Sequence, residues 1–367
     1  MIYIHIPFCK SRCLYCDFFS TTSLELRSRF VQSLLQEMKG RSEEICCARA
    51  NTIYIGGGTP SQMAPCDLKA LFDTLQCISP LEEGAEVTIE CNPDDVTSEF
   101  IEGLLATPVN RVSMGVQCMN DDLLHLLNRR HTADQARKAV KMLRESGYHN
   151  ISLDLMYGLP GQTMEMWQND VDELLAMRVP HLSAYSLQWE EGTPLYRMLE
   201  KGKVKEAPEE LSVAMYRYLV DTTRLAGMEH YEISNFAMPG MRARHNSGYW
   251  RNEAYVGLGP GAHSYDGGAK RSSNPPDLLG YIRSAGLPQQ EVEFLDEDAL
   301  YEEYVLKSLR TMDGMDIDLL ASKYRDYALN MVEPHILAGR VERQGNVLRL
   351  TEEGIFVSND VMSDMML

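Results

Sequence analysis

The chain opens with MIYIHIPFCKSRCLYC, residues 1–16, in which an apolar run at residues 2–6 leads into three cysteines spaced CxxxCxxC. A short run rich in isoleucine is typical of a buried β-strand. A compact loop after that strand can bring the thiols of Cys9, Cys13 and Cys16 to one place. This stretch therefore predicts a strand that ends directly at a metal-binding loop.

The same strand pattern recurs along the first half of the chain, separated by longer amphipathic segments. Five more strands are predicted at residues 51–55, 86–90, 111–116, 150–156 and 181–187. Strands that alternate with helices predict a parallel sheet with crossover helices. We therefore expect an α/β fold, an open partial (β/α)6 TIM-like barrel, with functional residues at the carboxyl ends of its strands.

Two further regions follow the alternating one. Residues 231–295 predict loops and short elements that close one side, within the segments 232–237, 245–250 and 257–265. From residue 296, helices at 299–309, 317–324 and 327–338 and two strands around Gly345 predict a small C-terminal winged-helix-like domain. The expected domains are thus 1–230, 231–295 and 296–367.

Composition restricts the class of partner. The 367 residues carry a formal net charge of −18, and residues 296–367 contain fifteen acidic and seven basic side chains. Phosphate backbones repel such a surface, which argues against nucleic acid even if the last domain has a winged-helix fold. No apolar run approaches the ~18 residues of a transmembrane segment, and nine cysteines without a signal peptide favour reduced thiols. We expect a cytoplasmic protein.

The cysteine spacing indicates which metal centre the loop holds. Three thiolates can bind three irons of a [4Fe–4S] cluster and leave the fourth iron open, whereas closed electron-transfer clusters take four cysteines. The alternative is a zinc site with His5 as its fourth ligand. Zinc loops more often use paired CxxC units, so the spacing favours the cluster.

Polar and flexible residues follow the other predicted strands. The run GGGTP at residues 56–60 allows backbone to approach a ligand closely, although such a run can also be only a tight bend. Glu90, Gln117 and Asp154 each stand at the exit of an apolar run. Because equivalent strand ends meet at one edge of a barrel, these side chains predict one shared site.

The cysteine loop resembles the signature of the radical S-adenosylmethionine (SAM) superfamily. The segments HIPFC, GGGTPS, IECNP, RVSMGVQ, NRRHT, LDLMYGLPGQT and YEISNFA further resemble the family that contains oxygen-independent coproporphyrinogen III oxidase and the HemW heme chaperones. The resemblance implies that the open iron binds SAM and that reduction of the sulfonium gives a 5′-deoxyadenosyl radical. It also implies that SAM is contacted by Tyr3, Tyr15, Gly57, Gly58, Thr59, Glu90, Gln117, Arg129 and Asp154.

Two departures from the oxidase pattern favour the chaperone branch. Only eight residues precede Cys9, where the oxidase has a longer segment, and Cys16 is followed by Asp17 and Phe18 where the oxidase has a further cysteine. In addition, HNSGYW at residues 245–250 resembles the HNxxYW motif of the heme-binding branch. That likeness implies heme contacts from His245, Tyr249 and Trp250, because imidazole can ligate heme iron and aromatic rings can lie flat against a porphyrin.

The resemblance thus implies a heme chaperone that binds heme and delivers it to apo-hemoproteins, with a reductant protein as electron donor. Coproporphyrinogen III oxidase activity is the alternative, and whether the chain is an enzyme at all stays open at this point. A cluster-bearing electron carrier is a third hypothesis, which predicts no SAM binding. Dimerisation through the acidic C-terminal domain is a further hypothesis.

Overall fold

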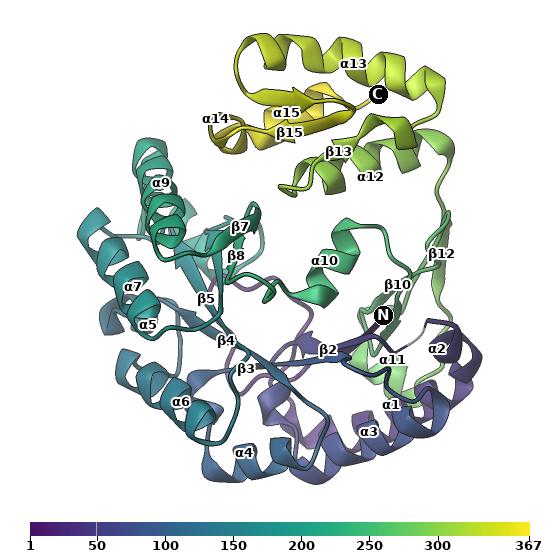
Figure 1. Ribbon diagram of the computed structural model, residues 1–367. Helices are drawn as coiled ribbons and strands as arrows, with labels where there is room; N and C mark the ends of the chain where they lie inside the picture. Colours follow the sequence, from purple (N-terminus) through teal and green to yellow (C-terminus); the bar gives the residue numbers. More distant parts are fainter. Residues whose placement is uncertain (49) are drawn as a thin grey trace.

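The fold is seen in a computed structural model, which describes residues 1–48 and 50–367. Within these residues the main sheet has nine strands, in the order β7-β8-β6-β5-β4-β3-β2-β1-β9 (Figure 1). Its first six strands are β1 (Ile2–Ile6), β2 (Thr52–Gly57), β3 (Glu86–Cys91), β4 (Arg111–Gln117), β5 (Ile151–Tyr157) and β6 (His181–Ser186). Each pairs in parallel with the next. The predicted α/β barrel is confirmed, and every predicted strand ends within two residues of an observed one.

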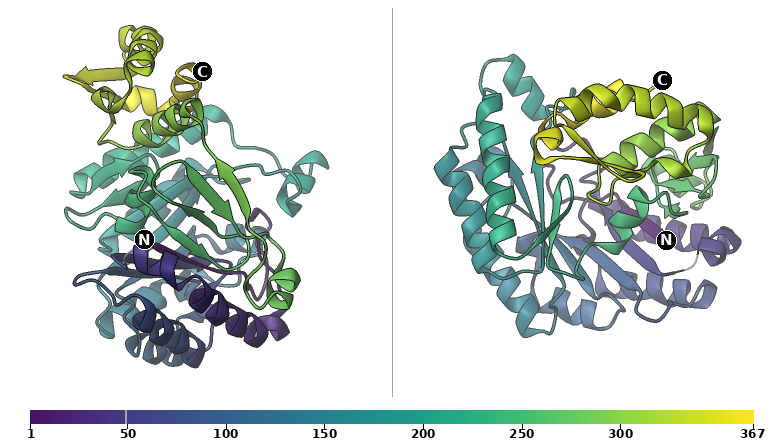
Figure 2. Two further views of the ribbon diagram at one scale, coloured as in Figure 1. Left: turned by 90° about the vertical axis from the view of Figure 1, so that its right-hand side faces the viewer. Right: turned by 45° about the horizontal axis from the view of Figure 1, so that its top comes forward.

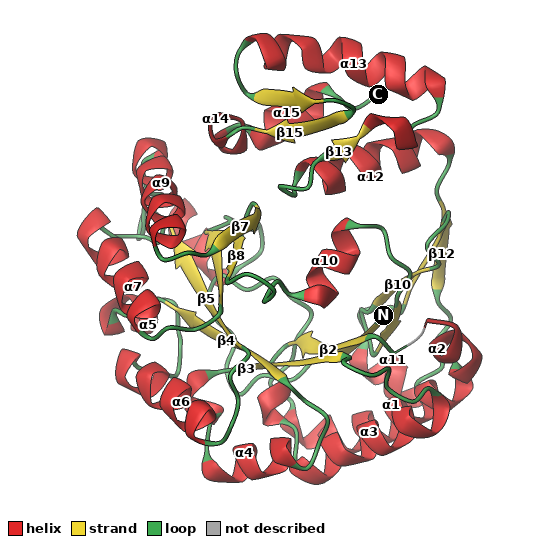
Figure 3. Cartoon of the chain, viewed as in Figure 1, coloured by secondary structure: helices red, strands yellow, loops and turns green. Residues whose placement is uncertain are grey.

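Helices cover the outer side of this curved sheet (Figures 1 and 3). The helices of this part of the chain are α1 (Arg27–Gly40), α2 (Ser42–Ala48), α3 (Pro65–Ile78), α4 (Ser98–Leu105), α5 (Asp121–Leu126), α6 (Ala133–Glu145), α7 (Met164–Ala176), α8 (Pro194–Glu200) and α9 (Glu209–Leu225), of which α5 and α8 bury their apolar side chains in a second, smaller cluster. Every second strand residue joins their core: Ile2, Ile4 and Ile6 of β1 are buried in one cluster with Phe30 and Leu34 of α1. Since side chains alternate along a strand, the intervening residues point to the inside of the barrel.

The inward-facing positions are polar. They include Tyr54 of β2, Glu90 of β3, Ser113 of β4, Asp154 of β5 and Ser183 of β6. Branched apolar side chains usually fill such an interior. A polar interior therefore predicts that the inside of this barrel receives a ligand.

The sheet continues beyond the alternating region. Strand β7 (Glu229–Glu232) and strand β8 (Asn235–Ala237) add an antiparallel hairpin beside β6, and β9 (Val256–Leu258) pairs in parallel with β1. Because β7 and β9 are the two ends of the strand order, the barrel is open. The sheet crosses the predicted boundary at residue 230, while the division into 1–230, 231–295 and 296–367 stays a prediction.

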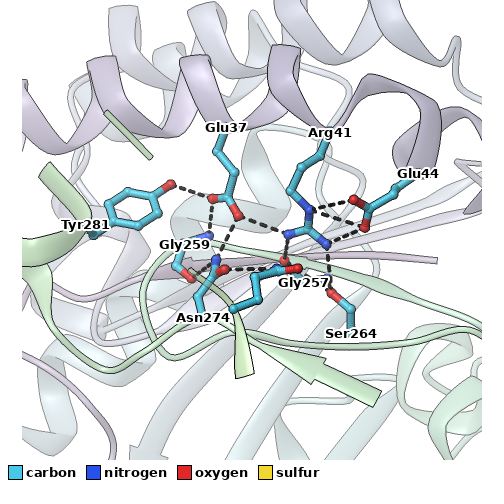
Figure 4. A network of polar contacts seen from close by, with 9 residues as sticks. Glu37, Arg41, Glu44, Gly257, Gly259, Ser264, Asn274 and Tyr281 are labelled. Atoms are coloured by element: carbon cyan, nitrogen blue, oxygen red, sulfur yellow. Dashed lines mark hydrogen bonds and ion pairs between the residues drawn. The ribbon is translucent and has the colours of Figure 1, made fainter. Parts of the chain in front are cut away.

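A buried network of polar contacts attaches β9 and the loop after it to α1 (Figure 4). The carboxylate of Glu37, with 0% exposure, accepts hydrogen bonds from the Gly259 backbone N–H (2.8 Å), Asn274 Nδ2 (2.7 Å) and the Tyr281 hydroxyl. Arg41 donates to the same carboxylate (3.0 Å) and to the carbonyl of Gly257 (2.7 Å). The network therefore holds an edge strand that is only three residues long.

The remaining elements are short. Helix α10 (Arg244–Trp250) precedes β9, and β10 (His263–Tyr265), β11 (Lys270–Ser273) and β12 (Glu291–Phe294) form a separate antiparallel sheet next to α11 (Leu278–Arg283). The last part of the chain contains α12 (Glu297–Leu309), β13 (Met315–Asp316), α13 (Ser322–Leu337), β14 (Val341–Gln344), β15 (Val347–Leu350), α14 (Glu352–Phe356) and α15 (Ser358–Asp364). This last part of the chain lies next to the β7–β8 hairpin of the barrel (Figure 2).

One prediction in this last part is wrong in detail. The two helices expected at residues 317–324 and 327–338 are a 3-10 turn, Ile317–Leu319, followed by the single helix α13. The helix is continuous because Tyr324, Ala328 and Val332 recur every four residues on one buried face. In the described residues, no helix is long and apolar enough to cross a membrane.

Candidate functional site

A cavity of about 400 Å³ opens at the carboxyl ends of the parallel strands. This is the edge of a β/α barrel at which binding and catalytic groups gather. Of the residues singled out from the sequence, its wall contains Cys9, Cys13, Tyr15, Cys16, Gly57, Gly58, Thr59, Glu90, Gln117, Arg129 and Asp154. The fold therefore places in one cavity side chains that come from six different parts of the sequence.

The cysteine loop is tied down at both ends. The Cys9 N–H donates to the carbonyl of Thr21 (2.9 Å), whose own N–H donates to the carbonyl of Pro7 (2.7 Å). On the other side, the Leu14 N–H donates to Leu127 (3.1 Å) and Asn128 Nδ2 donates to the carbonyl of Arg12 (2.8 Å). These contacts fix the loop against the segment that carries Arg129.

The thiols are surrounded by hydrogen-bond donors. Thr59 Oγ1 donates to Cys9 Sγ (3.5 Å) and Arg129 Nη1 donates to Cys13 Sγ (3.2 Å). Burial raises the pKa of Cys9 and raises that of Cys16 to about 11. A bound cation such as iron is therefore needed to keep these sulfurs as thiolates at neutral pH.

The donor set fits a cluster better than a single ion. In residues 1–48 and 50–367, no group of three His, Cys, Asp and Glu side chains closes around one metal ion. The His5 ring, considered as a fourth zinc ligand, instead lies between the Tyr3 hydroxyl (3.0 Å from Nδ1) and the Phe19 carbonyl (2.9 Å from Nε2). Three soft thiols on one cavity wall are the ligands that a [4Fe–4S] cluster with one open iron requires.

The glycine run packs against the cysteine loop. The Gly58 N–H donates to the carbonyl of Ile6 and the Thr59 N–H donates to that of Phe8, both at 2.8 Å. A Cβ atom on Gly58 would lie 2.8 Å from both carbonyl oxygens, and Gly57 has φ +109° with His5 2.5 Å from its missing Cβ. These glycines are thus required by the close approach of two backbones, and the same approach leaves Gly57, Gly58 and Thr59 on the cavity wall.

The two inward carboxyl groups are held in different ways. Glu90 accepts hydrogen bonds from the Tyr54 hydroxyl (2.7 Å) and the Gly57 N–H (3.1 Å), and burial raises its pKa to about 7. Burial also raises the pKa of Asp154, to about 6, while Ser183 and Ser113 hydroxyls oppose that rise. Both groups are therefore poised between the neutral and the charged form near neutral pH.

Arg129 connects three parts of the site. Its Nη2 donates to Asn92 Oδ1 (2.7 Å) and to the Gly115 carbonyl, and its Nη1 faces Cys13. Gly115 leaves the room that this needs, because a Cβ there would lie 3.3 Å from Arg129 Nη2 and 2.7 Å from Gln117 Nε2. Gln117 itself has φ +70°, at an irregularity in the β4–β5 pairing.

The residues expected to contact heme lie elsewhere. His245 has 0% exposure, with Nδ1 2.8 Å from Thr52 Oγ1 and Nε2 3.0 Å from the Tyr249 hydroxyl. The carboxylate of Glu86 accepts the N–H groups of Arg244 and His245, each at 3.0 Å, and so caps α10 at the amino-terminal end of the barrel. Of the HNSGYW motif, it is Asn246 that lines the cavity.

Several cavity residues were not found from the sequence. They are Tyr54, Asn92, Arg111, Ser113, Ser183, Tyr185 and Asn246. Arg111 stands at the beginning of β4 and Asn246 on a helix far along the chain, so a search for polar residues at strand ends omits both. For those of these residues that lie in strands, the available signal was the alternation of polar and apolar residues along each strand.

The fold and the thiol-lined cavity define a member of the radical SAM superfamily, and the family model described as "Radical SAM superfamily" matches residues 3–174. A protein of Lactococcus lactis named heme chaperone HemW is 33% identical, with 100% of this chain and 97% of the relative covered. The heme chaperone HemW of Bacillus subtilis is 35% identical, with 98% and 97% covered. The chain therefore belongs to the HemW family of heme chaperones within the radical SAM superfamily.

A solved structure supports the fold. The coproporphyrinogen III oxidase (HemN) of Escherichia coli, a radical SAM enzyme, aligns with a TM-score of 0.85 over 99% of this chain and 89% of that chain. At 21% identity, this likeness establishes the architecture and not the activity.

Proposed function

We propose that this chain binds heme and delivers it to apo-hemoproteins, and that it carries a [4Fe–4S] cluster and SAM. The observation behind the heme proposal is the match over nearly the full length to relatives named heme chaperones. The observation behind the cofactors is the cavity in which three thiols face two inward carboxyl groups. Delivery of heme requires recipient apo-hemoproteins, and use of the cluster requires a reductant protein.

Each part of the cavity has a role in this proposal. Cys9, Cys13 and Cys16 would hold three irons of the cluster, which when bound would supply one-electron reduction of the SAM sulfonium. Tyr15, Gly57, Gly58, Thr59, Gln117 and Arg129 would contact the cofactor near the cluster, and Glu90 and Asp154 would accept hydrogen bonds from its hydroxyl or amino groups. Tyr3 does not line the cavity and would act indirectly, because its ring stacks on Tyr54 and its hydroxyl is hydrogen-bonded to His5 beside the cysteine loop.

Heme contact through the HNSGYW motif needs a change at α10. Both ring nitrogens of His245 are hydrogen-bonded, and burial lowers its pKa to about 3. Its Nε2 can ligate iron only after the Tyr249 hydroxyl leaves it. We therefore expect Tyr249→Phe, which frees this nitrogen, to affect heme binding differently from His245→Ala.

The deciding experiment is a heme titration of the anaerobically reconstituted protein, followed by absorbance, with coproporphyrinogen turnover measured in parallel. Stoichiometric heme binding without turnover supports the chaperone. Weaker binding in His245→Ala but not in Tyr249→Phe would assign His245 as a ligand, provided that both variants unfold at similar temperatures. SAM-dependent turnover of coproporphyrinogen, with no heme binding, would replace the proposal by the oxidase.

A further inference from the structure

Arg111 is a buried cation for which the described residues show no direct hydrogen bond or ion pair, although its charge acts on the carboxyl groups of Glu90 and Asp154 in the same cavity. Its residue exposure is 2%, and its Nε is among the buried nitrogens that have no hydrogen-bond partner in the described chain. The neighbouring cavity arginine, Arg129, uses its Nη1 and Nη2 atoms for three hydrogen bonds, whereas the described ion pairs and side-chain hydrogen bonds include none from Arg111. Burial of a guanidinium that makes no direct hydrogen bond or ion pair is costly, so such a group is a candidate for binding an anion.

The side chains around Arg111 are polar. It faces Thr88 across the β3–β4 pairing, and the buried hydroxyl of Thr88 also has no partner in the described chain. Asn246 reaches the same cavity from α10. Arg111 and Asn246 line the cavity, and Thr88 lies next to Arg111 on the neighbouring strand; we call this group of three residues the floor of the cavity.

The positive charge of Arg111 shifts the pKa values of nearby titratable groups. It lowers the pKa of His181 and His245, for which burial is the larger cause, and it opposes the burial that raises the pKa of Asp154. Along β4, Arg111 stands six residues before Gln117, which is roughly 20 Å at about 3.3 Å per residue. A group bound at Arg111 is therefore well separated from the strand ends that hold the cysteine loop.

We infer that the floor of the cavity is a carboxylate-binding subsite, in which Arg111 pairs with a singly charged carboxylate of an organic ligand. A planar guanidinium matches the two oxygens of a carboxylate. A dianion such as phosphate fits less well, because Glu90 and Asp154 already place negative charge in the same cavity. The inference does not rest on heme binding, since a free small acid and the carboxylate arm of a larger ligand offer the same chemistry.

Sodium propionate is the probe for this subsite, tested on the anaerobically reconstituted full chain by thermal unfolding. Propionate should raise the unfolding temperature of the wild type in a saturable way, because it binds only the folded state. Propionamide, of equal size without the charge, and sodium chloride at equal concentration should not. Equal responses to propionate and chloride would overturn the inference.

Variants test whether Arg111 is the binding group. Arg111→Gln should abolish the response to propionate, Arg111→Lys should weaken it at least several-fold, and Arg283→Gln, at an exposed position, should keep it. Without propionate, Arg111→Gln should unfold near the wild-type temperature, since Arg111 makes no direct hydrogen bond or ion pair in the described chain. A fall of several degrees in this variant would show a structural role and would contradict the subsite.

A comparison of heme with its dimethyl ester separates the two sources of the carboxylate. If the arm of heme reaches Arg111, the ester binds wild type more weakly than heme does, and Arg111→Gln removes the difference. Equal binding of both, together with the propionate response, assigns the subsite to a separate small acid. Absence of any heme binding would refute the proposed chaperone function but would leave the propionate result intact.

Discussion

At the scale of single residues, the three loop cysteines differ in their surroundings from the exposed cysteines of the chain. Cys9 and Cys13 accept hydrogen bonds from Thr59 and Arg129 inside the cavity, whereas Cys66 is exposed on α3. We expect Cys9→Ser, Cys13→Ser or Cys16→Ser to lose most of the bound iron and its charge-transfer absorbance after reconstitution, because each removes one of three ligands. Cys66→Ser is the matched control and should keep both. Stoichiometric zinc with little iron in the wild type would contradict the cluster.

Glu90 gives a prediction for pH. Its folded-state pKa of about 7 lies above the ordinary value of 4.5, so the folded state binds the proton more tightly than the unfolded state does. The stability that this proton provides is therefore lost as pH rises from about 4.5 through 7. Glu90→Gln, which cannot ionise, should be more stable than wild type at pH 8 by about 1–2 kcal/mol, after allowance for one lost hydrogen bond.

Urea denaturation at pH 5 and pH 8 checks this prediction for Glu90. The advantage of Glu90→Gln should shrink toward pH 5, where wild-type Glu90 is protonated. Asp73→Asn, on the exposed side of α3, should show no such pH dependence. An equal difference between variant and wild type at both pH values would mean that the Glu90 pKa is not raised.

The cysteines and the strand-end carboxyl groups could be predicted from the sequence because spacing and position are local properties. Arg111 and Asn246 could not be predicted in this way. Arg111 is distinguished by an Nε without a hydrogen-bond partner, and Asn246 by its place on the cavity wall, and both properties depend on how other elements pack around them. For His245, the motif and the surroundings of the side chain were not equally predictable. Its motif was recognisable, but the two hydrogen bonds that enclose its ring come from β2 and from its own helix.

At the scale of elements, the six parallel strands were predictable because each is a run of alternating or continuous apolar residues between helices. Strands β8 and β9 have three residues each, too few to show a period. Their strand conformation depends on pairing with β6 and β1, which the sequence alone does not reveal. The network around Glu37 is part of what fixes β9.

Glu37 is therefore expected to be important for stability. Glu37→Ala should lower the free energy of unfolding by about 3–5 kcal/mol, because Arg41 would stay buried without its full set of partners. Glu37→Gln should cost less, since the amide oxygen still accepts hydrogen bonds from the Gly259 N–H or the Tyr281 hydroxyl. Urea denaturation measures both variants.

The control for Glu37 is Glu43→Ala, which removes an exposed carboxylate in the adjacent helix α2. Its effect should stay within about 0.5 kcal/mol. A similar small effect of Glu37→Ala would show that the buried network does not hold β9 in place.

At the scale of the whole molecule, the C-terminal residues are joined to the barrel through the β7–β8 hairpin. The N–H groups of Ile233 and Met312 donate to the carbonyls of Arg310 (3.2 Å) and Tyr231 (3.0 Å). Peripheral ion pairs, such as Arg217 with Glu353, are exposed on both sides and contribute little. The sequence predicted a small, acidic, winged-helix-like C-terminal domain, but not which surface of the barrel it packs against.

The Arg310–Glu232 pair is the strongest candidate for the link between these two parts. Glu232 has 0% exposure and accepts from Arg310 Nε at 2.9 Å, and the Arg310 guanidinium also lies 4.7 Å from the ring centre of Trp250, at the end of α10. Since Arg310 is 30% exposed, solvent weakens the pair, and we expect Arg310→Met to cost about 1–3 kcal/mol. A double-mutant cycle with Glu232→Gln should give a coupling above about 0.5 kcal/mol, and limited proteolysis should cut Arg310→Met near residue 296 sooner than wild type. Additive effects of the two substitutions, with an unchanged cleavage pattern, would mean that the C-terminal domain is held by its apolar contacts and not by this pair.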